Sequence, residues 1–149
     1  MKLIILTILL LSLFSCAFAQ EARKIDEFGD VTCADITFRS INFFDEVRKI
    51  QNSTGYVIVY NGKLTYNAKD KPLYPHRNEA KSEIENIKTR IDLNRFDKKR
   101  VVFIEGGLRD YLTVEFWLVP KNTTPPKPTP TLTKMKYRKG KPKNPCGEF

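Results

Sequence analysis

Near its middle the chain reads Gly55-Tyr56-Val57-Ile58-Val59-Tyr60, a short run of β-branched and aromatic residues. Residues of these types favour strands, and an unbroken apolar run indicates a strand that is buried on both faces. Asn61-Gly62 follows directly and is typical of a turn. We therefore expect residues 55–60 to form an interior strand of a sheet.

One helix is predicted before this strand in the sequence and another after it. Before it, apolar residues recur at every third position, at Phe38, Ile41, Phe44, Val47 and Ile50, and Phe43 widens this apolar face. A helix with so wide an apolar face should be heavily buried. After the strand, a single narrow apolar stripe is formed by Ala80, Ile84, Ile87 and Ile91. The charged residues of this second helix are expected to face water; they are Lys81, Glu83, Glu85 and Lys88.

Further strands are predicted at residues 101–104, at residues 111–119 and, at the sheet edge, at residues 24–28. Residues 111–119 alternate, with Leu112, Val114, Phe116 and Leu118 on one side, which is typical of an antiparallel strand. The strand, helix and strand between residues 55 and 104 predict a right-handed parallel crossover, and residues 105–110 predict a hairpin connection. The expected fold is an α/β (α+β) sandwich, in which a mixed parallel and antiparallel sheet carries two helices on one face.

The N-terminus predicts export. Lys2 precedes an apolar run that ends in the triplet Ala17-Phe18-Ala19, which is typical of a signal peptide at residues 1–19 that is cleaved after Ala19. An alternative is a lipobox at residues 13–16, which would anchor a lipoprotein at Cys16. No second apolar stretch of spanning length occurs in residues 20–149, so no transmembrane segment is expected after processing.

The charge of the chain, +9, is concentrated in residues 120–149, which contain eight basic residues against Glu148 and seven of the nine prolines. Such a composition predicts a basic, proline-rich tail that is extended, polyproline-like or disordered. It favours weak, salt-sensitive adhesion to anionic partners. Residues 20–119 are nearly neutral, so no specific nucleic-acid partner is expected.

Two cysteines remain after the predicted cleavage, Cys33 and Cys146. An oxidising compartment permits a disulfide between them, which would tie the tail to the domain. Thr32 and Asp35 are spaced to cap a helix, which would instead leave the Cys33 thiol in its first turn. A disulfide and a buried or unpaired thiol therefore both stay open.

Few residues suggest a site. Gly106, Gly107 and Arg109 could bind a ligand, because glycines let the backbone approach it and arginine offers a donor fork; otherwise Arg109 pairs with a neighbouring acid. His76 is the one histidine, expected in an exposed loop. Four aromatic residues could line a sugar-binding face or simply pack, namely Tyr56, Tyr60, Tyr111 and Trp117. The spacing of histidine, cysteine and acids predicts no metal site, and no cofactor is expected.

The element order and several motifs resemble known families. The order helix, buried strand, helix, strand, strand, with Arg95-Phe96-Asp97-Lys98-Lys99-Arg100-Val101-Val102 before the third run, resembles the OmpA-like peptidoglycan-associated domain. Three motifs are similar to those of small secreted bacterial proteins of the kind seen in acidobacteria: Asp26-Glu27-Phe28-Gly29-Asp30, residues 55–60, and Gly106-Gly107-Leu108-Arg109-Asp110-Tyr111-Leu112-Thr113-Val114-Glu115-Phe116-Trp117-Leu118-Val119-Pro120. The resemblance implies a fold and an address, but no activity.

One departure from the OmpA-like family bears on binding. In that family an Asp after the first core strand and an Arg on the next helix grip the diaminopimelate carboxylates of peptidoglycan. Here Asn61-Gly62-Lys63 follows the strand, and the arginine position falls on Glu83 or Glu85. An acid at that position repels a ligand carboxylate. We therefore expect the usual peptidoglycan site to be absent, and no ligand residue is transferred.

Together these observations predict an exported, non-enzymatic cell-envelope protein, in the periplasm or outside the cell. Its domain, residues 20–119, would bind an envelope protein or an anionic polymer. Two alternatives stay open: a small secreted hydrolase that uses His76 or Arg109, and a peptidoglycan binder that uses non-standard residues.

Overall fold

The computed structural model of the protein describes residues 21–65, 71–142 and 146. The elements in chain order are β1 (Arg23–Phe28), α2 (Cys33–Lys49), β2 (Thr54–Lys63), α3 (Glu79–Leu93), the 3-10 helix η1 (Lys98–Arg100), β3 (Val101–Tyr111) and β4 (Thr113–Val119). The predicted signal peptide and the alternative lipid attachment at Cys16 lie outside the described residues. Of the helices that the structure describes, none is long and apolar enough to cross a membrane.

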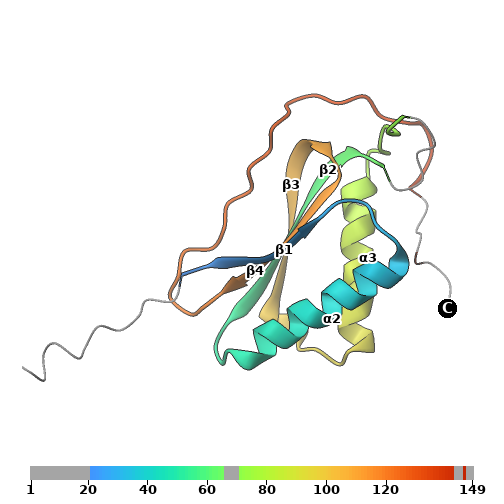
Figure 1. Cartoon of the computed structure of the whole chain (residues 1–149). Coiled ribbons are helices and arrows are strands. Elements are labelled where there is room, and N and C mark those ends of the chain that lie inside the picture. The colour runs from blue at the N-terminus through green and yellow to red at the C-terminus, as the bar shows by residue number, and fades with distance from the viewer. Residues whose placement is uncertain (1–20, 66–70, 143–145, 147–149) are drawn as a thin grey trace, which may run out of the picture.

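The four strands form one mixed sheet in the order β1-β4-β2-β3. β2 pairs parallel with β3 and antiparallel with β4, while β1 pairs antiparallel with β4 at the edge. Both helices lie on one face of the sheet (Figure 1). This arrangement confirms the predicted fold class and the edge strand near residues 24–28. It also confirms the parallel pairing of β2 and β3, the strands that precede and follow α3 in the sequence.

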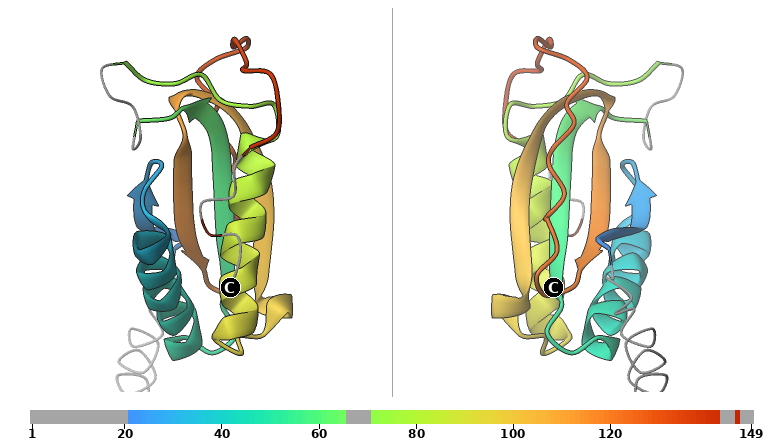
Figure 2. Two further views of the ribbon diagram at one scale, coloured as in Figure 1. Left: turned by 90° about the vertical axis from the view of Figure 1, so that its right-hand side faces the viewer. Right: turned by 90° about the vertical axis from the view of Figure 1, so that its left-hand side faces the viewer.

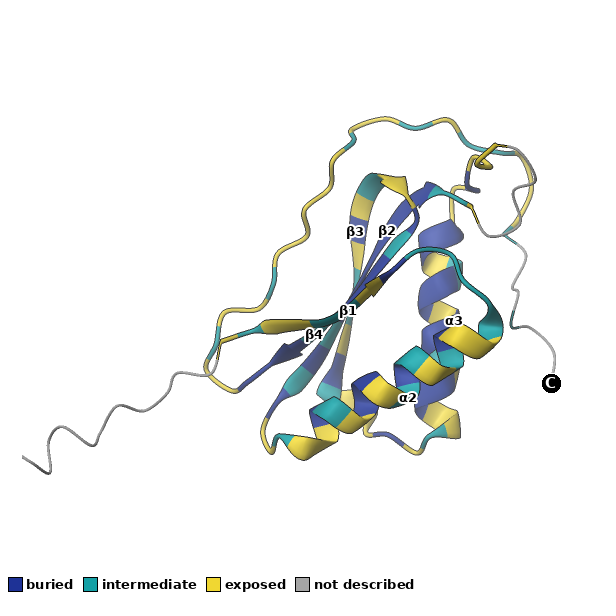
Figure 3. Ribbon diagram, viewed as in Figure 1, coloured by how far each residue is buried: buried dark blue, intermediate teal, exposed yellow. Residues whose placement is uncertain are grey.

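The core lies between the sheet and the two helices, where the buried residues of both layers meet (Figure 3). The rings of Phe43 in α2 and Phe116 in β4 stack with their centroids 4.5 Å apart. Gly55 makes room for this packing, because a Cβ there would lie 2.5 Å from the Phe43 ring. Burial of these aromatic residues supplies much of the hydrophobic stabilisation of the fold.

The face of α2 differs from the predicted one. The helix begins at Cys33, where the Thr32 hydroxyl accepts a hydrogen bond from the Asp35 amide at 3.0 Å. Its buried residues are Ile36, Ser40, Phe43, Phe44 and Val47. Phe38 is 65% exposed, so the prediction that it faces the core is wrong. A repeat of three residues drifts around a helix of 3.6 residues per turn, and Phe38 lies at the end that has drifted away from the sheet.

The connection between β3 and β4 is not the predicted hairpin. Residues 105–110 belong to β3, and β2 lies between the two strands. Leu112 alone joins them, and its amide donates to the Lys63 carbonyl oxygen at 3.0 Å. The chain therefore crosses directly over the end of β2 at Gly62, where a Cβ would lie 2.0 Å from the Tyr111 carbonyl carbon. Asn61-Gly62 serves this crossing inside a longer strand and forms no turn.

Residues 120–142, which we call the strap, run as an extended segment across the helix-free face of the sheet and over its end toward α3 (Figure 2). The Thr129 amide donates to the Tyr60 hydroxyl at 3.1 Å, and the Thr131 amide to the Leu108 carbonyl oxygen at 2.9 Å. The extended alternative therefore describes residues 120–142, and the disordered one does not. Proline restricts the strap to extended conformations, and these hydrogen bonds fix its place on the sheet.

A disulfide joins Cys33 at the start of α2 to Cys146, 113 residues later. It ties the end of the described chain to the helix layer, on the opposite side of the sheet from the first part of the strap. Of the two states that the sequence left open, the structure has the bridge.

Gly62→Ala should destabilise the protein by about 3 kcal/mol, because the added Cβ meets backbone that cannot move without breaking the crossing. The measurement is urea unfolding. Gly29→Ala is the comparison, since its Cβ would lie 3.3 Å from the Leu112 carbonyl oxygen, a tight contact that a shift of a few tenths of an ångström relieves. Equal unfolding midpoints for the two variants would contradict the crossing as described.

Replacing both Cys33 and Cys146 by Ser should lower the free energy of unfolding by about 2–5 kcal/mol, because the bridge closes a long loop in the unfolded chain. Urea unfolding of the wild type with and without dithiothreitol should give the same loss. A midpoint that does not respond to reductant would show that the two cysteines are not joined in solution.

Candidate functional site

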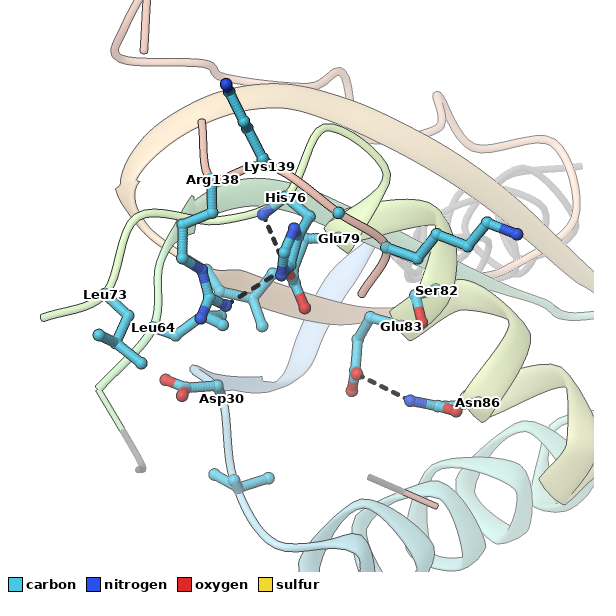
Figure 4. Close-up of a pocket in the computed structure, with 14 residues that line it drawn as sticks. Asp30, Leu64, Leu73, His76, Glu79, Ser82, Glu83, Asn86, Arg138 and Lys139 are labelled. Atoms are coloured by element: carbon cyan, nitrogen blue, oxygen red, sulfur yellow. Dashed lines mark hydrogen bonds and ion pairs between the residues drawn. The ribbon is translucent and has the colours of Figure 1, made fainter. Parts of the chain in front are cut away.

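A cavity of about 560 Å³ lies beside the first half of α3. Its walls come from segments far apart in the sequence: the link from β1 to α2, the end of β2, the loop before α3, and residues 138–141 of the strap (Figure 4). Cavities of this size typically hold small ligands. The strap is thus part of the cavity wall as well as a cover for the sheet.

Helix α3 lines the cavity with a row of polar side chains. Glu79, Glu83 and Asn86 follow one another at spacings of four and three residues and are all buried. The prediction that Glu83 faces water is wrong, because it is only 8% exposed. The apolar stripe of α3 faces the sheet as predicted, whereas the polar row faces the cavity, so the helix is buried on two sides. Helical spacing in this polar row was the sequence signal that could have revealed it.

Glu83 is an acid in an unfavourable position for a charge. Burial raises its pKa, and the negative charges of Glu79 and Asp30 raise it further. A hydrogen bond from Asn86 Nδ2 to Glu83 Oε2, 3.2 Å long, and the charge of Arg90 act in the opposite direction. The net result is a raised pKa, so Glu83 gains a proton more readily than an exposed glutamate.

His76 lies in the cavity wall, and the expectation of an exposed loop histidine is wrong. It is 9% exposed, its backbone amide donates to Glu79 Oε2 at 2.8 Å, and its carbonyl oxygen accepts from Asn61 Nδ2 at 3.2 Å. These bonds hold the loop against the ends of α3 and β2. Its Nδ1 is buried and has no hydrogen-bond partner among the described residues.

The strap closes the cavity from outside with basic residues. The Arg138 amide donates to the Pro75 carbonyl oxygen at 2.9 Å, and its Nη2 lies 4.0 Å from Glu79 Oε2. Arg138 Nε is buried and has no partner within the described part of the chain. Lys139 and Lys141 also line the cavity. The cavity therefore has acids on its helical side and bases on its strap side.

Gly106, Gly107 and Arg109 form no open loop. All three lie in β3, where a Cβ on Gly106 would lie 2.6 Å from the Tyr60 ring. Gly107 has a φ of +92° at a register shift opposite β2. Glycine is suited to such a bulge, because it adopts positive φ at little cost. The two glycines are therefore explained by strand geometry.

Arg109 is held by neighbours on the helix-free face. Its guanidinium lies 3.5 Å from the centre of the Tyr60 ring and donates to Glu115 at 2.9 Å and to Thr129 Oγ1 at 2.6 Å. Burial alone would raise the pKa of Glu115, but hydrogen bonds from Trp117, Lys24 and Arg109 lower it. The alternative in which Arg109 pairs with a neighbouring acid is the arrangement found.

The four aromatic residues do not form one open sugar-binding face. Tyr60 is fully buried under Arg109 and the strap, and Trp117 Nε1 donates to Glu115 at 3.0 Å. Tyr56 is the cross-strand partner of Trp117, whereas Tyr111 lies at the far end of β3 beside Lys63. Cross-strand packing accounts for Tyr60, Trp117 and Tyr56.

His76 and Arg109, the two residues considered for catalysis, lie on opposite faces of the sheet. Arg109 stacks on Tyr60, whereas His76 bonds to Asn61, the next residue of β2. Successive residues of a strand point to opposite faces, so the two side chains cannot act on one substrate. Among the described residues no group of three or more histidines, cysteines and acids could hold a metal ion.

No family model, no curated protein and no solved structure matches the chain.

Glu83→Gln should stabilise the protein at pH 8. A carboxyl whose pKa is raised on folding contributes its full stability only below its pKa in the unfolded chain, and this contribution is lost as the pH rises through the folded-state value. Glutamine cannot ionise, so the advantage of the variant should shrink as the pH falls from the raised folded-state pKa toward the ordinary glutamate pKa, and it should be smallest below that ordinary value. Urea unfolding at several pH values measures this.

The matched control is Glu85→Gln, an exposed position on the same helix that pairs with Lys88 at 2.8 Å. It should change stability by less than about 0.5 kcal/mol at any pH. Identical pH profiles for the wild type and Glu83→Gln would contradict the buried, ionisable state described for Glu83.

Proposed function

We propose that the protein is an exported, non-enzymatic cell-envelope protein that binds a group of its partner in the cavity beside α3. The observation that carries this proposal is the lining of the cavity. Asn86 Oδ1 and His76 Nδ1 are buried there without hydrogen-bond partners among the described residues. Buried polar atoms are normally paired, so unpaired ones around a cavity of about 560 Å³ are suited to a polar ligand.

Export is supported by two independent features. The N-terminal sequence has the pattern of a signal peptide. The disulfide between Cys33 and Cys146 is of a kind that persists in oxidising compartments outside the cytosol. An OmpA-like identity stays part of this proposal, with an envelope protein or polymer as the partner.

The strap adds a second, weaker mode of attachment. Its exposed lysines include Lys121, Lys127, Lys134 and Lys136, spread along the segment and open to solvent. Exposed charges of one sign attract anionic polymers without specificity, and salt screens this attraction. The cavity would give selectivity, and the strap would raise the local concentration at an anionic envelope surface.

The alternative of a small hydrolase that uses His76 or Arg109 receives less support. Arg109 is engaged by Glu115, Tyr60 and Thr129, which leaves no open side for a substrate. His76 lies in the cavity, but its contacts with Asn61 and Glu79 are made through its backbone. The ring Nδ1 has no hydrogen-bond partner among the described residues, so no described acid orients the ring as the acid of a catalytic triad does.

Filling the cavity should weaken the salt-resistant part of envelope binding. We expect Ser82→Trp, a substitution in the cavity wall, to lower binding of the chain from Gln20 to Phe149 at high salt by roughly tenfold. The measurements are cosedimentation with purified peptidoglycan sacculi and capture on immobilised envelope extract. Lys81→Trp, one residue earlier and exposed, is the matched control and should bind like the wild type.

Neutralising Lys134 and Lys136 should reduce only the binding seen at low salt. If no envelope preparation binds the wild type, or if high-salt binding survives Ser82→Trp in a folded protein, the proposed function is wrong. Far-UV circular dichroism and urea unfolding of both tryptophan variants establish that they are folded.

A further inference from the structure

We propose that the cavity binds a primary alkylammonium group whose short apolar stem ends in a carboxylate. A free ω-amino acid and the lysine at the C-terminus of a peptide share this chemistry. The inference rests on the proposed function, since it names the ligand of the same cavity.

On the helical side of the cavity, Glu83 has no ion-pair partner among the described residues. Glu83 accepts one hydrogen bond, from Asn86 Nδ2, and no lysine or arginine of the described chain forms an ion pair with it. Arg90 belongs to the same helix, but its Nη2 donates to Cys33 Sγ at 2.8 Å. Asn86 is 2% exposed, and its Oδ1 has no donor within the described residues. A positively charged group with several N–H donors would satisfy both side chains.

The geometry of these acceptors favours an ammonium over a guanidinium. A guanidinium is bound best by both oxygens of one carboxylate, in a planar fork. One oxygen of Glu83 already accepts from Asn86, so a guanidinium fork would have to share that oxygen with the amide. The three N–H groups of an ammonium diverge and suit acceptors on separate side chains, here Glu83 and Asn86. The negative charge of Asp30, also in the wall, adds to the attraction.

The strap side of the cavity selects the other end of the ligand. Arg138, Lys139 and Lys141 line it, and Arg138 Nε is a buried donor without an acceptor in the described part of the chain. A carboxylate would accept from Arg138, whereas a second ammonium would be repelled. Four apolar residues also line the cavity and suit a methylene stem, namely Val31, Leu64, Leu73 and Leu112.

Isothermal titration calorimetry with the chain from Gln20 to Phe149 tests this assignment. The probes are 6-aminohexanoate, hexylamine, hexanoate and 1,5-diaminopentane, which differ only in their end groups. We expect 6-aminohexanoate to bind at least roughly tenfold more tightly than any of the other three. An acetylated tripeptide that ends in lysine, with a free or an amidated C-terminus, distinguishes the two sources: only the free form should bind if the natural ligand is a peptide end.

Variants locate the two ends. Glu83→Gln should weaken 6-aminohexanoate by roughly tenfold or more, because the ammonium loses its counter-charge, while Glu85→Gln should bind like the wild type. Arg138→Gln should remove the preference for 6-aminohexanoate over hexylamine. Urea unfolding of each variant shows that it is folded under the titration conditions.

Two results would overturn the inference. The first is that neither 6-aminohexanoate nor the free lysine peptide binds saturably, and the second is that Glu83→Gln leaves their binding unchanged. These results are separable from failure of the proposed function. Envelope binding that Ser82→Trp abolishes, with no amine bound, upholds the proposed function and refutes this ligand. Amine binding that depends on Glu83, without any envelope binding, upholds the ligand and refutes the proposed function.

Discussion

The crossing of the chain over Gly62 is the constraint on which the other features depend. The backbone at Tyr111 and Leu112 passes so close to β2 that only glycine fits beneath it. This crossing takes the chain from the parallel side of β2 to its antiparallel side within one residue. It places β4 against β1, gives the core its Phe116 ring, and brings Leu112 into the wall of the cavity. A hairpin at residues 105–110 would have left β2 with a different neighbour and the cavity without that wall.

Features that follow from a local sequence pattern were predicted well. The run Gly55 to Tyr60 indicated an interior strand, and the stripe from Ala80 to Ile91 indicated one buried side of α3. Phe38 is an error within one helix, because a repeat of three residues drifts away from the buried face of α2. The other errors concern contacts between distant segments. Glu83 resembled a solvated helix charge until the strap and the loop at His76 were placed over it. Gly106 and Gly107 resembled a turn, because nothing in their own sequence shows that β3 must bulge past Tyr60. No periodicity reports a partner that is tens of residues away.

The pKa values of the two buried glutamates, Glu115 and Glu83, are shifted in opposite directions on the two sides of the sheet. Glu115, on the helix-free face, accepts from Lys24, Arg109 and Trp117, and its pKa is lowered. Glu83, on the helical side, has an amide for its donor and a raised pKa. A fully hydrogen-bonded ion network stabilises one structure. A buried acid with few hydrogen-bond partners and a raised pKa is typical of functional sites. The strap contributes to both environments. Thr129 accepts a hydrogen bond from Arg109, which pairs with Glu115, and Arg138 lines the cavity that contains Glu83.

The disulfide between Cys33 and Cys146 also bears on the order in which the wall of the cavity is completed. Every strand and both helices lie between the two cysteines or directly before the first, and the bridge spans 113 residues. It cannot form while the intervening chain is still being synthesised. The wall that the strap supplies is therefore the last part of the cavity to be secured. Under the proposed export, a chain in transit would lack this part of the wall, and the cavity would be complete only after the chain reaches the compartment in which the disulfide forms.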